Sequence, residues 1–306
     1  MKQGPQLALA GLFHSGDNRP MRSSFLSRFR LPRPALALAS LALLAGCASD
    51  PDLVQRADAL VAPAGLQREE VRGGPFVLTA YVHARPKAPL LRVYLEGDGR
   101  AWITRNQVSP DPTPHTAMGL RLAASDGGDV VYLARPCQFT PMARNPICQP
   151  EYWAGLRYSP LVVSAMDEAL SRYVARLQPA RLELVGFSGG GAIAVLLAAR
   201  RKDVSAIRTV AGNLDHVAVN QWHKVSQMPG SLNPIDVAAQ VERIPQLHVS
   251  GAEDTVIPTA ITHSFVDQVG RCAGLVTVQG MAHQSDWDRL WPKLLAVPLP
   301  CTAKQP

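Results

Sequence analysis

Strand-like and helix-like runs alternate along most of this chain of 306 residues. The strand-like runs are rich in β-branched and aromatic residues and cover residues 76–82, 90–95, 129–134, 181–185, 206–211, 246–250 and 275–279. Helix-like runs lie between or after them, in residues 114–124, 163–177, 190–200, 259–269 and 287–295. This alternation predicts the α/β class, with one domain over residues 65–301 whose mostly parallel β-sheet is flanked by helices on both faces.

One of these strands ends in the sequence Gly186-Phe-Ser-Gly-Gly190, where a single serine stands among glycines. A helix-like run follows directly. In a sharp strand-to-helix turn a serine takes a strained backbone conformation, and neighbours without side chains relieve the crowding. We therefore interpret Ser188 as an exposed nucleophile. The alternative is a Gly-rich turn with a purely structural role.

A serine nucleophile needs a base and an acid that orients the base, and in G-x-S-x-G enzymes the order is Ser, acid, His. His283 follows the last predicted strand in a loop, where its imidazole can reach back over the sheet. His248 lies inside a strand and His263 inside a helix, so we expect a packed residue and a surface residue. His283 is therefore the predicted base.

Three acidic residues are candidates for the orienting acid. Glu253 and Asp254 lie in the loop after the strand at 246–250, and Asp215 follows the strand before it. Asp215 can equally well cap a loop.

The oxyanion of an acyl-transfer reaction needs backbone N–H donors. Gly189, directly after the serine, is expected to supply one. The loop after the strand at 90–95 should supply the other, and from residue 96 it reads Glu-Gly-Asp-Gly, so the expected donor is Gly97 or Asp98. An acid near an oxyanion is unfavourable unless its side chain points away or binds a cation.

Together these features resemble the α/β-hydrolase superfamily over residues 65–301. The spacing Gly-x-x-Asp-x-x-Ile-Pro resembles its acid loop, which selects Asp254 and leaves Glu253 either on the surface or as a carboxylate that contacts the catalytic residues without taking part. The stretches at 135–138, 152–153, 157–159 and 230–233 resemble a group of uncharacterised proteobacterial hydrolase lipoproteins. Neither resemblance indicates a substrate.

Residues 21–46 have the pattern of an export signal: a basic start, an apolar run at 35–44 and small residues after it. The apolar run is too short to span a bilayer. Residues 1–20 are interpreted as a wrongly assigned start, because Met21 begins a signal of conventional length.

The sequence Leu44-Ala-Gly-Cys47 resembles the lipobox of bacterial lipoproteins, which implies lipidation of Cys47. The alternative is a chance cysteine after a plain signal peptide. Residues 47–64 would then be a tether. Because no aspartate follows Cys47, the expected location is the outer membrane, facing the periplasm.

Four further cysteines follow, at positions 137, 148, 272 and 301. In an oxidising periplasm an even number suggests disulfides, with three possible pairings. We favour the local pairing of 137 with 148 and of 272 with 301. Motifs for metals, dinucleotides and nucleotide phosphates are absent, so no metal or cofactor is expected.

Charge argues against nucleic acid as a partner. The chain has 31 basic and 24 acidic residues, of which six and one lie in residues 1–46, leaving 25 and 23. A remainder of +2 has no electrostatic footprint for nucleic acid.

The predicted function is that of a serine esterase acting on a small or medium acyl ester. The segment 213–240 is the expected short cap, with Trp222, His223 and Met228 placed to border the acyl group. A serine peptidase is one alternative, because Gly-x-Ser-Gly-Gly also resembles peptidases of this fold. The other is an inactive, lipid-anchored binding or assembly protein.

Overall fold

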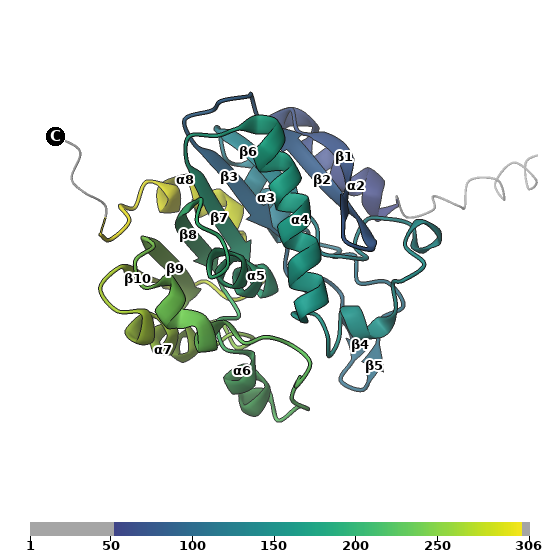
Figure 1. Ribbon diagram of the computed structural model, residues 1–306. Helices are drawn as coiled ribbons and strands as arrows, with labels where there is room; N and C mark the ends of the chain where they lie inside the picture. Colours follow the sequence, from purple (N-terminus) through teal and green to yellow (C-terminus); the bar gives the residue numbers. More distant parts are fainter. Residues whose placement is uncertain (1–51, 302–306) are drawn as a thin grey trace, which may run out of the picture. The chain divides into compact units, whose positions relative to one another are not determined.

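The structure is a computed structural model that describes residues 52–301 (Figure 1). Eight strands of this part form one sheet in the order β1-β2-β6-β3-β7-β8-β9-β10. The strands are β1 (Gln67–Gly73), β2 (Phe76–His83), β3 (Leu91–Leu95), β6 (Asp129–Leu133), β7 (Leu182–Phe187), β8 (Val204–Val210), β9 (Gln246–Gly251) and β10 (Ala273–Val278). β2 pairs antiparallel with β1 and β6, and all other neighbours are parallel. The predicted α/β class and mostly parallel sheet are confirmed.

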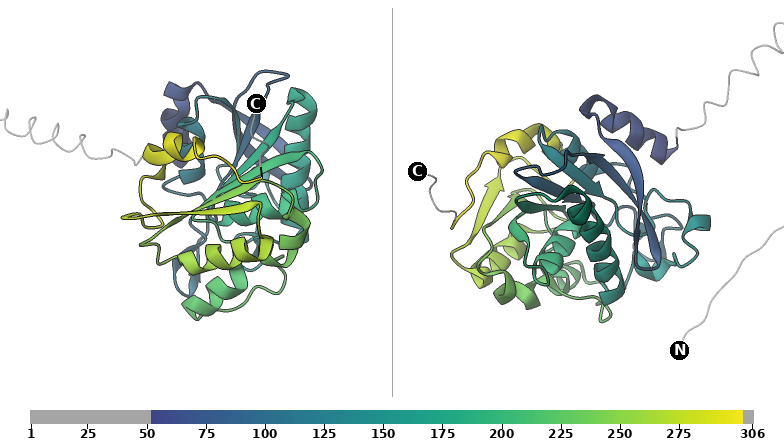
Figure 2. Two further views of the ribbon diagram at one scale, coloured as in Figure 1. Left: turned by 90° about the vertical axis from the view of Figure 1, so that its left-hand side faces the viewer. Right: turned by 45° about the horizontal axis from the view of Figure 1, so that its top comes forward.

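Helices cover both faces of the sheet. On one face lie α2 (Leu53–Val61), α3 (Met118–Ala124) and α8 (Trp287–Leu295), and on the other α4 (Pro160–Leu177), α5 (Gly189–Ala198) and α7 (Thr259–Val269). The left view of Figure 2 shows α2 and α8 on the opposite side of the sheet from α4. Side chains of one strand alternate between the two cores: in β7, Leu184 packs with α4 and α5, and Val185 with α3 and α8.

Several short elements were not predicted. They are η1 (Ala62–Ala64), the hairpin β4 (Trp102–Thr104) and β5 (Gln107–Val108), η2 (Met142–Arg144), η3 (Pro150–Tyr152), α6 (His216–His223) and η4 (Pro234–Val241). β1 was also missed, because its charged sequence lies half exposed at the edge of the sheet and lacks the apolar pattern of a buried strand.

The ordered part of the chain starts before residue 65. Residues 53–61, expected to belong to the tether, form α2, which Asp52 caps and which buries Ala57 and Val61. The Tyr81 hydroxyl donates a hydrogen bond to Asp58 on the same helix, at 2.7 Å. The predicted signal segment, Cys47 and the first residues of the tether lie outside the described residues.

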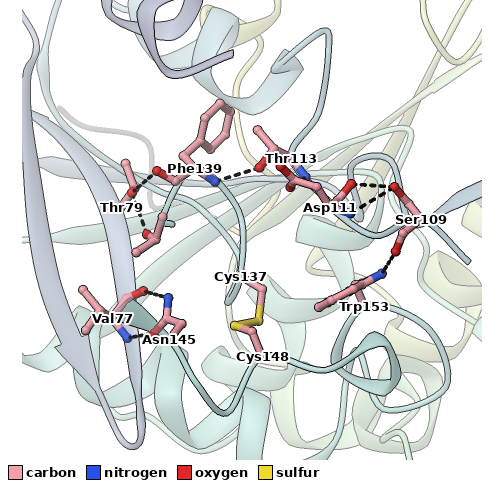
Figure 3. Close-up of a disulfide and its surroundings, with 11 residues drawn as sticks. Val77, Thr79, Ser109, Asp111, Thr113, Cys137, Phe139, Asn145, Cys148 and Trp153 are labelled. Atoms are coloured by element: carbon pink, nitrogen blue, oxygen red, sulfur yellow. Dashed lines mark hydrogen bonds between the residues drawn. A yellow bond between two sulfur atoms is a disulfide. The ribbon is translucent and has the colours of Figure 1, made fainter. Parts of the chain in front are cut away.

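Both locally paired disulfides are present, Cys137–Cys148 and Cys272–Cys301. Figure 3 shows the first of them inside a loop that is fastened to the sheet and to the β4–β5 region. Asn145 exchanges two hydrogen bonds with the backbone of Val77 on β2, and the Trp153 indole donates to the carbonyl of Ser109. This loop is thereby held against the domain at several points.

Two negative findings apply to residues 52–301. No helix there is long and apolar enough to cross a membrane. No group of three or more His, Cys, Asp or Glu residues in this range could hold a metal ion.

His248 is a packed residue of β9. Its Nδ1 accepts from the Thr209 hydroxyl at 2.8 Å, and its Nε2 donates to Gln246 Oε1 at 3.0 Å. Burial lowers the pKa of His248 from 6.5 to about 3, because the interior disfavours the charged imidazolium. The side chain is therefore a neutral member of the core.

We expect this histidine to make stability depend on pH. Above pH 6.5 it is neutral in both states, and as the pH falls from 6.5 toward about 3 only the unfolded chain takes up its proton. The free energy of unfolding should therefore decrease in this window, by up to about 1.4 kcal/mol per pH unit. When urea titrations are repeated across this pH range, the free energy of unfolding should change less steeply with pH in His248→Gln than in the parent. The difference in slope should correspond to one bound proton. Equal slopes for the two proteins would contradict this assignment.

Candidate active site

Ser188 occupies the turn between β7 and α5 with φ 51° and ψ −119°, a conformation that non-glycine residues rarely adopt. Glycine is required on both sides. A Cβ added at Gly186 would lie 2.3 Å from the carbonyl oxygen of Gly190, and one added at Gly190 would lie 2.1 Å from that of Leu95. The glycines therefore let the helix begin against the backbone of β3, and they present the serine at the end of the sheet.

A chain of hydrogen bonds runs from this serine through His283 to Asp254. The Oγ of Ser188 lies 3.0 Å from Nε2 of His283, and Nδ1 of His283 lies 2.8 Å from Oδ2 of Asp254. The histidine follows β10 and the aspartate follows β9, as predicted. Because a carboxylate only accepts hydrogen bonds, Nδ1 carries the proton and Nε2 is free to accept from the serine.

The Asp254 carboxylate is itself held in place. Its Oδ1 accepts from the backbone N–H groups of Val256 and Ile257, both at 2.8 Å, and the side chain is buried. One oxygen is thus fixed by the loop while the other faces His283. Such an arrangement sets the tautomer and the orientation of the imidazole.

The other candidates for base and acid lie elsewhere. Asp215 caps α6, where its Oδ1 accepts from Val217 and Ala218. His263 is exposed and pairs with Asp267 at 2.9 Å, and Glu253 is exposed.

The loop after β3 lies beside the serine. A Cβ added at Gly97 would lie 3.3 Å from Cβ of Ser188. The N–H of Gly97, however, donates to Glu96 Oε1 at 2.9 Å. The backbone N–H groups of Asp98 and Gly189 have no hydrogen-bond acceptor among residues 52–301. Of the two donors expected in this loop, only Asp98 therefore has an N–H group that is open to a ligand, as Gly189 has.

The Glu96 carboxylate points away from the serine. Besides Gly97, the N–H groups of Gly119 and Leu120 and the Tyr132 hydroxyl donate to it, at 3.0–3.3 Å. Burial raises the pKa of Glu96, and these donors only partly offset the effect. Its role is to attach the loop to the start of α3.

The Asp98 carboxylate binds two cations. Arg135 and Arg157 contact it at 3.2 and 3.0 Å, and the Tyr158 hydroxyl at 2.9 Å. Burial alone would raise the pKa of Asp98, but the charges of Arg157 and Arg135 and the Tyr158 hydrogen bond outweigh it, so the pKa lies below its usual value. The carboxylate also abuts Gly189, where an added Cβ would lie 2.0 Å from Oδ1.

The sequence left two possibilities for an acid in this loop, a side chain that points away or one that binds a cation, and it did not identify the two arginines that bind Asp98. Both belong to the stretches that carry the lipoprotein-group resemblance, on either side of the loop closed by Cys137–Cys148. Arg135 also donates to the carbonyl of Arg157, which joins the two ends of that loop.

A cavity of about 700 Å³ opens next to Ser188. Its wall includes residues 219–220 and 223–228, Val256 and Ile257 on the facing loop, and three residues of the unpredicted β4–β5 hairpin, Trp102, Arg105 and Asn106. His223 and Met228 of the expected cap contribute to this wall. Trp222 does not, and its side chain is exposed instead.

We expect Gly190→Ala to be strongly destabilising, because the new methyl group would overlap the Leu95 carbonyl. The cost should be at least about 1–3 kcal/mol, as for other overpacked sites. Gly127→Ala is the matched control, since nothing lies within 4 Å of the added Cβ. Urea unfolding should separate the two variants, and an unchanged midpoint for Gly190→Ala would show that the backbone contact is not tight.

Comparison with known proteins places this geometry in a wider setting. No family model matches the chain, and no curated protein matches it. Solved structures do match this chain. An α/β serine hydrolase homologue from Coxiella burnetii is 17% identical, with 75% of this chain and 97% of that chain covered and a TM-score of 0.52. A serine hydrolase without lid from Xanthomonas campestris is 13% identical, with 78% and 97% covered and a TM-score of 0.51.

Puromycin hydrolase is 15% identical, with a TM-score of 0.54 and 75% of this chain covered, but the match spans only 37% of the length of that chain. At such low identities these likenesses concern the fold alone. Residues 52–301 have the α/β-hydrolase fold.

Proposed function

We propose that this protein is a serine hydrolase that cleaves small or medium acyl esters through a covalent acyl-enzyme. The observation that carries the proposal is the hydrogen-bond chain from Ser188 to His283 to Asp254, at 3.0 and 2.8 Å, beside an open cavity. A binding protein has no need of a nucleophile, a base and an oriented acid in hydrogen-bonding contact.

In the first half of the reaction, Nε2 of His283 takes the hydroxyl proton as Oγ of Ser188 attacks the ester carbonyl carbon. Asp254 holds the ring and stabilises the imidazolium. The N–H groups of Gly189 and Asp98 donate to the oxyanion, and His283 returns the proton to the leaving alcohol. In the second half, water attacks the acyl carbon while His283 takes its proton, the bond from that carbon to Oγ of Ser188 breaks, and His283 returns the proton to Oγ as the carboxylic acid leaves.

The acidic loop does not disqualify this site. Asp98 brings one negative charge close to the oxyanion donors, but Arg135 and Arg157 bring two positive charges into direct contact with it. Together, Asp98, Arg135 and Arg157 therefore carry one net positive charge. This charge stabilises a developing oxyanion and so favours the transition state. The same contacts restrain the backbone of Asp98, whose N–H is the donor.

The cavity supports the choice of substrate class. Val219, Met228 and Ile257 provide apolar wall next to Ser188, and a volume of about 700 Å³ accommodates a small or medium acyl group. We also propose, from the sequence alone, that Cys47 carries a lipid anchor and that the protein faces the periplasm from the outer membrane.

A fluorophosphonate should label the protein with one adduct per chain, on Ser188. Ser188→Ala should take no label, and His283→Ala should react on the order of 10⁴-fold more slowly or worse, because the base is gone. Intact-mass spectrometry measures both.

Two matched variants sharpen the test. His263→Ala removes an exposed histidine and should label like the parent. For ester turnover, Asp254→Asn should cost on the order of 10⁴-fold, whereas Asp215→Asn keeps a good helix cap and should change little. A well-folded parent protein that takes no label would refute the enzyme assignment, and faster cleavage of amides than of matched esters would favour a peptidase.

Asp98, Arg135, Arg157 and Tyr158, which we call the Asp98 cluster, lead to a separate prediction. Asp98→Asn keeps the shape of the side chain but loses its ion pairs with Arg135 and Arg157. The loop N–H should then be less well placed, so kcat should fall by up to about 10²–10³-fold, the cost of one oxyanion donor. KM should change little, because this donor acts mainly in the transition state. A rise in KM with kcat unchanged would instead assign Asp98 to ground-state binding.

A further inference from the structure

Exposed apolar side chains gather around the mouth of the Ser188 cavity. Seven large apolar residues are exposed in the part of the chain that the structure describes, and two of them, Leu60 and Leu161, lie on α2 and α4. The other five form what we call the cavity rim: Trp102, Ile103, Trp222, Val225 and Val256. Trp102, Val225 and Val256 also line the cavity itself.

The rim comes from three segments that are bonded to one another. Arg105, in the turn between β4 and β5, donates from Nη2 to the carbonyl oxygens of His223 and Lys224, at 2.7 and 3.2 Å. The His223 ring in turn contacts the carbonyl of Val256, with Nε2 and O 2.8 Å apart. Figure 1 shows β4, β5 and α6 at the same end of the domain. The three segments therefore lie together at the mouth of the cavity, where Trp102, Val225 and Val256 line it and Ile103 and Trp222 are exposed on the same segments.

The charge of this surface is positive. Residues 102–108 and 216–228 contain no Asp or Glu, and they carry Arg105 and Lys224, while Asp215, directly before α6, is partly buried as the N-cap of that helix. Within residues 52–301 neither of these cations forms an ion pair. The third segment has one exposed acid, Glu253, and its other acid, Asp254, is buried against His283.

We propose that the cavity rim docks onto a lipid surface that carries anionic headgroups. Tryptophan is favoured at the membrane interface because its ring is apolar and its N–H is polar. Apolar side chains next to Lys and Arg, with few acids, are the composition that binds anionic lipid. The interior of a protein interface, by contrast, is depleted in lysine. Docking brings the mouth of the Ser188 cavity against the headgroups, so that an ester can enter directly from the membrane.

Tryptophan fluorescence tests this surface without interference from the rest of the chain. All five tryptophans lie within the described residues, and Trp153, Trp287 and Trp291 are buried. A shift of the emission to shorter wavelength on adding vesicles therefore reports on Trp102 and Trp222. The full chain with Ser188→Ala is used throughout, so that no lipid is hydrolysed and the result is independent of the proposed catalysis.

Vesicles of phosphatidylcholine and phosphatidylglycerol in equal parts should shift the emission and carry the protein down in sedimentation. Combining Ile103→Ser with Trp222→Ser should weaken this binding about tenfold or more, because two apolar side chains no longer enter the interface. Lys224→Gln should weaken it about fivefold, the contribution of one cation near an anionic surface. Vesicles of pure phosphatidylcholine should bind less tightly.

Leu60→Ser is the matched control, because it removes an exposed apolar side chain on α2, far from β4 in Figure 1. It should bind like the parent, and a thermal scan of each variant shows that the fold is kept. The predicted leader is the same in every variant, so it cannot account for differences between them. Equal binding by the rim variants and the control would overturn the proposal. An emission shift that depends on protein concentration and not on lipid would overturn it as well, and would assign the rim to self-association.

Discussion

The first turn of α5 is in contact with the backbone at the end of β3, and the site depends on this contact. Gly190 allows it, since any side chain would meet the Leu95 carbonyl. The contact places Ser188 and the N–H of Gly189 beside the loop that carries Asp98. His283 and Asp254 then need only short loops after β10 and β9, because the carboxyl ends of parallel strands meet at one edge of the sheet. The contact between α5 and β3 therefore helps to bring together residues that follow four strands, β3, β7, β9 and β10.

The Asp98 cluster solves an electrostatic problem that the same contact creates. A loop that approaches the serine this closely brings an aspartate against Gly189, and an unpaired carboxylate there would repel an oxyanion. Arg135 before the loop closed by Cys137–Cys148 and Arg157 after it pair with this carboxylate, and the Tyr158 hydroxyl donates to it. The segments that flank the disulfide loop in Figure 3 thus supply charge to the site, and the hydrogen bond from Arg135 to the carbonyl of Arg157 holds them together.

Features that depend on residues close together in the sequence could be predicted from it, whereas contacts between residues far apart in the chain could not. The parallel strands other than the partly exposed β10 are mostly buried, and the bounds of α7 and α8 agree with the predicted ranges, because periodicity reports burial. The hydrogen-bonding contact of Ser188, His283 and Asp254 could be expected from the sequence because a motif and its chain order single out these residues. Arg135 and Arg157 lie 37 and 59 residues from Asp98, and no local pattern encodes such a pair. Trp222 was placed toward the acyl group, but the register of a short helix such as α6 is set by its packing, which turns that ring outward.

The charged edge strand β1 also affects how copies of this protein meet. An outer strand of a sheet offers free N–H and C=O groups to any other strand, which is a route to aggregation. β1 has the sequence Gln-Arg-Glu-Glu-Val-Arg-Gly, in which charged side chains fill most positions and most are solvated. A second copy that paired there in register would have to bring like charges together and remove them from water. The residues that made this strand hard to recognise in the sequence therefore keep one border of the sheet from growing by strand addition.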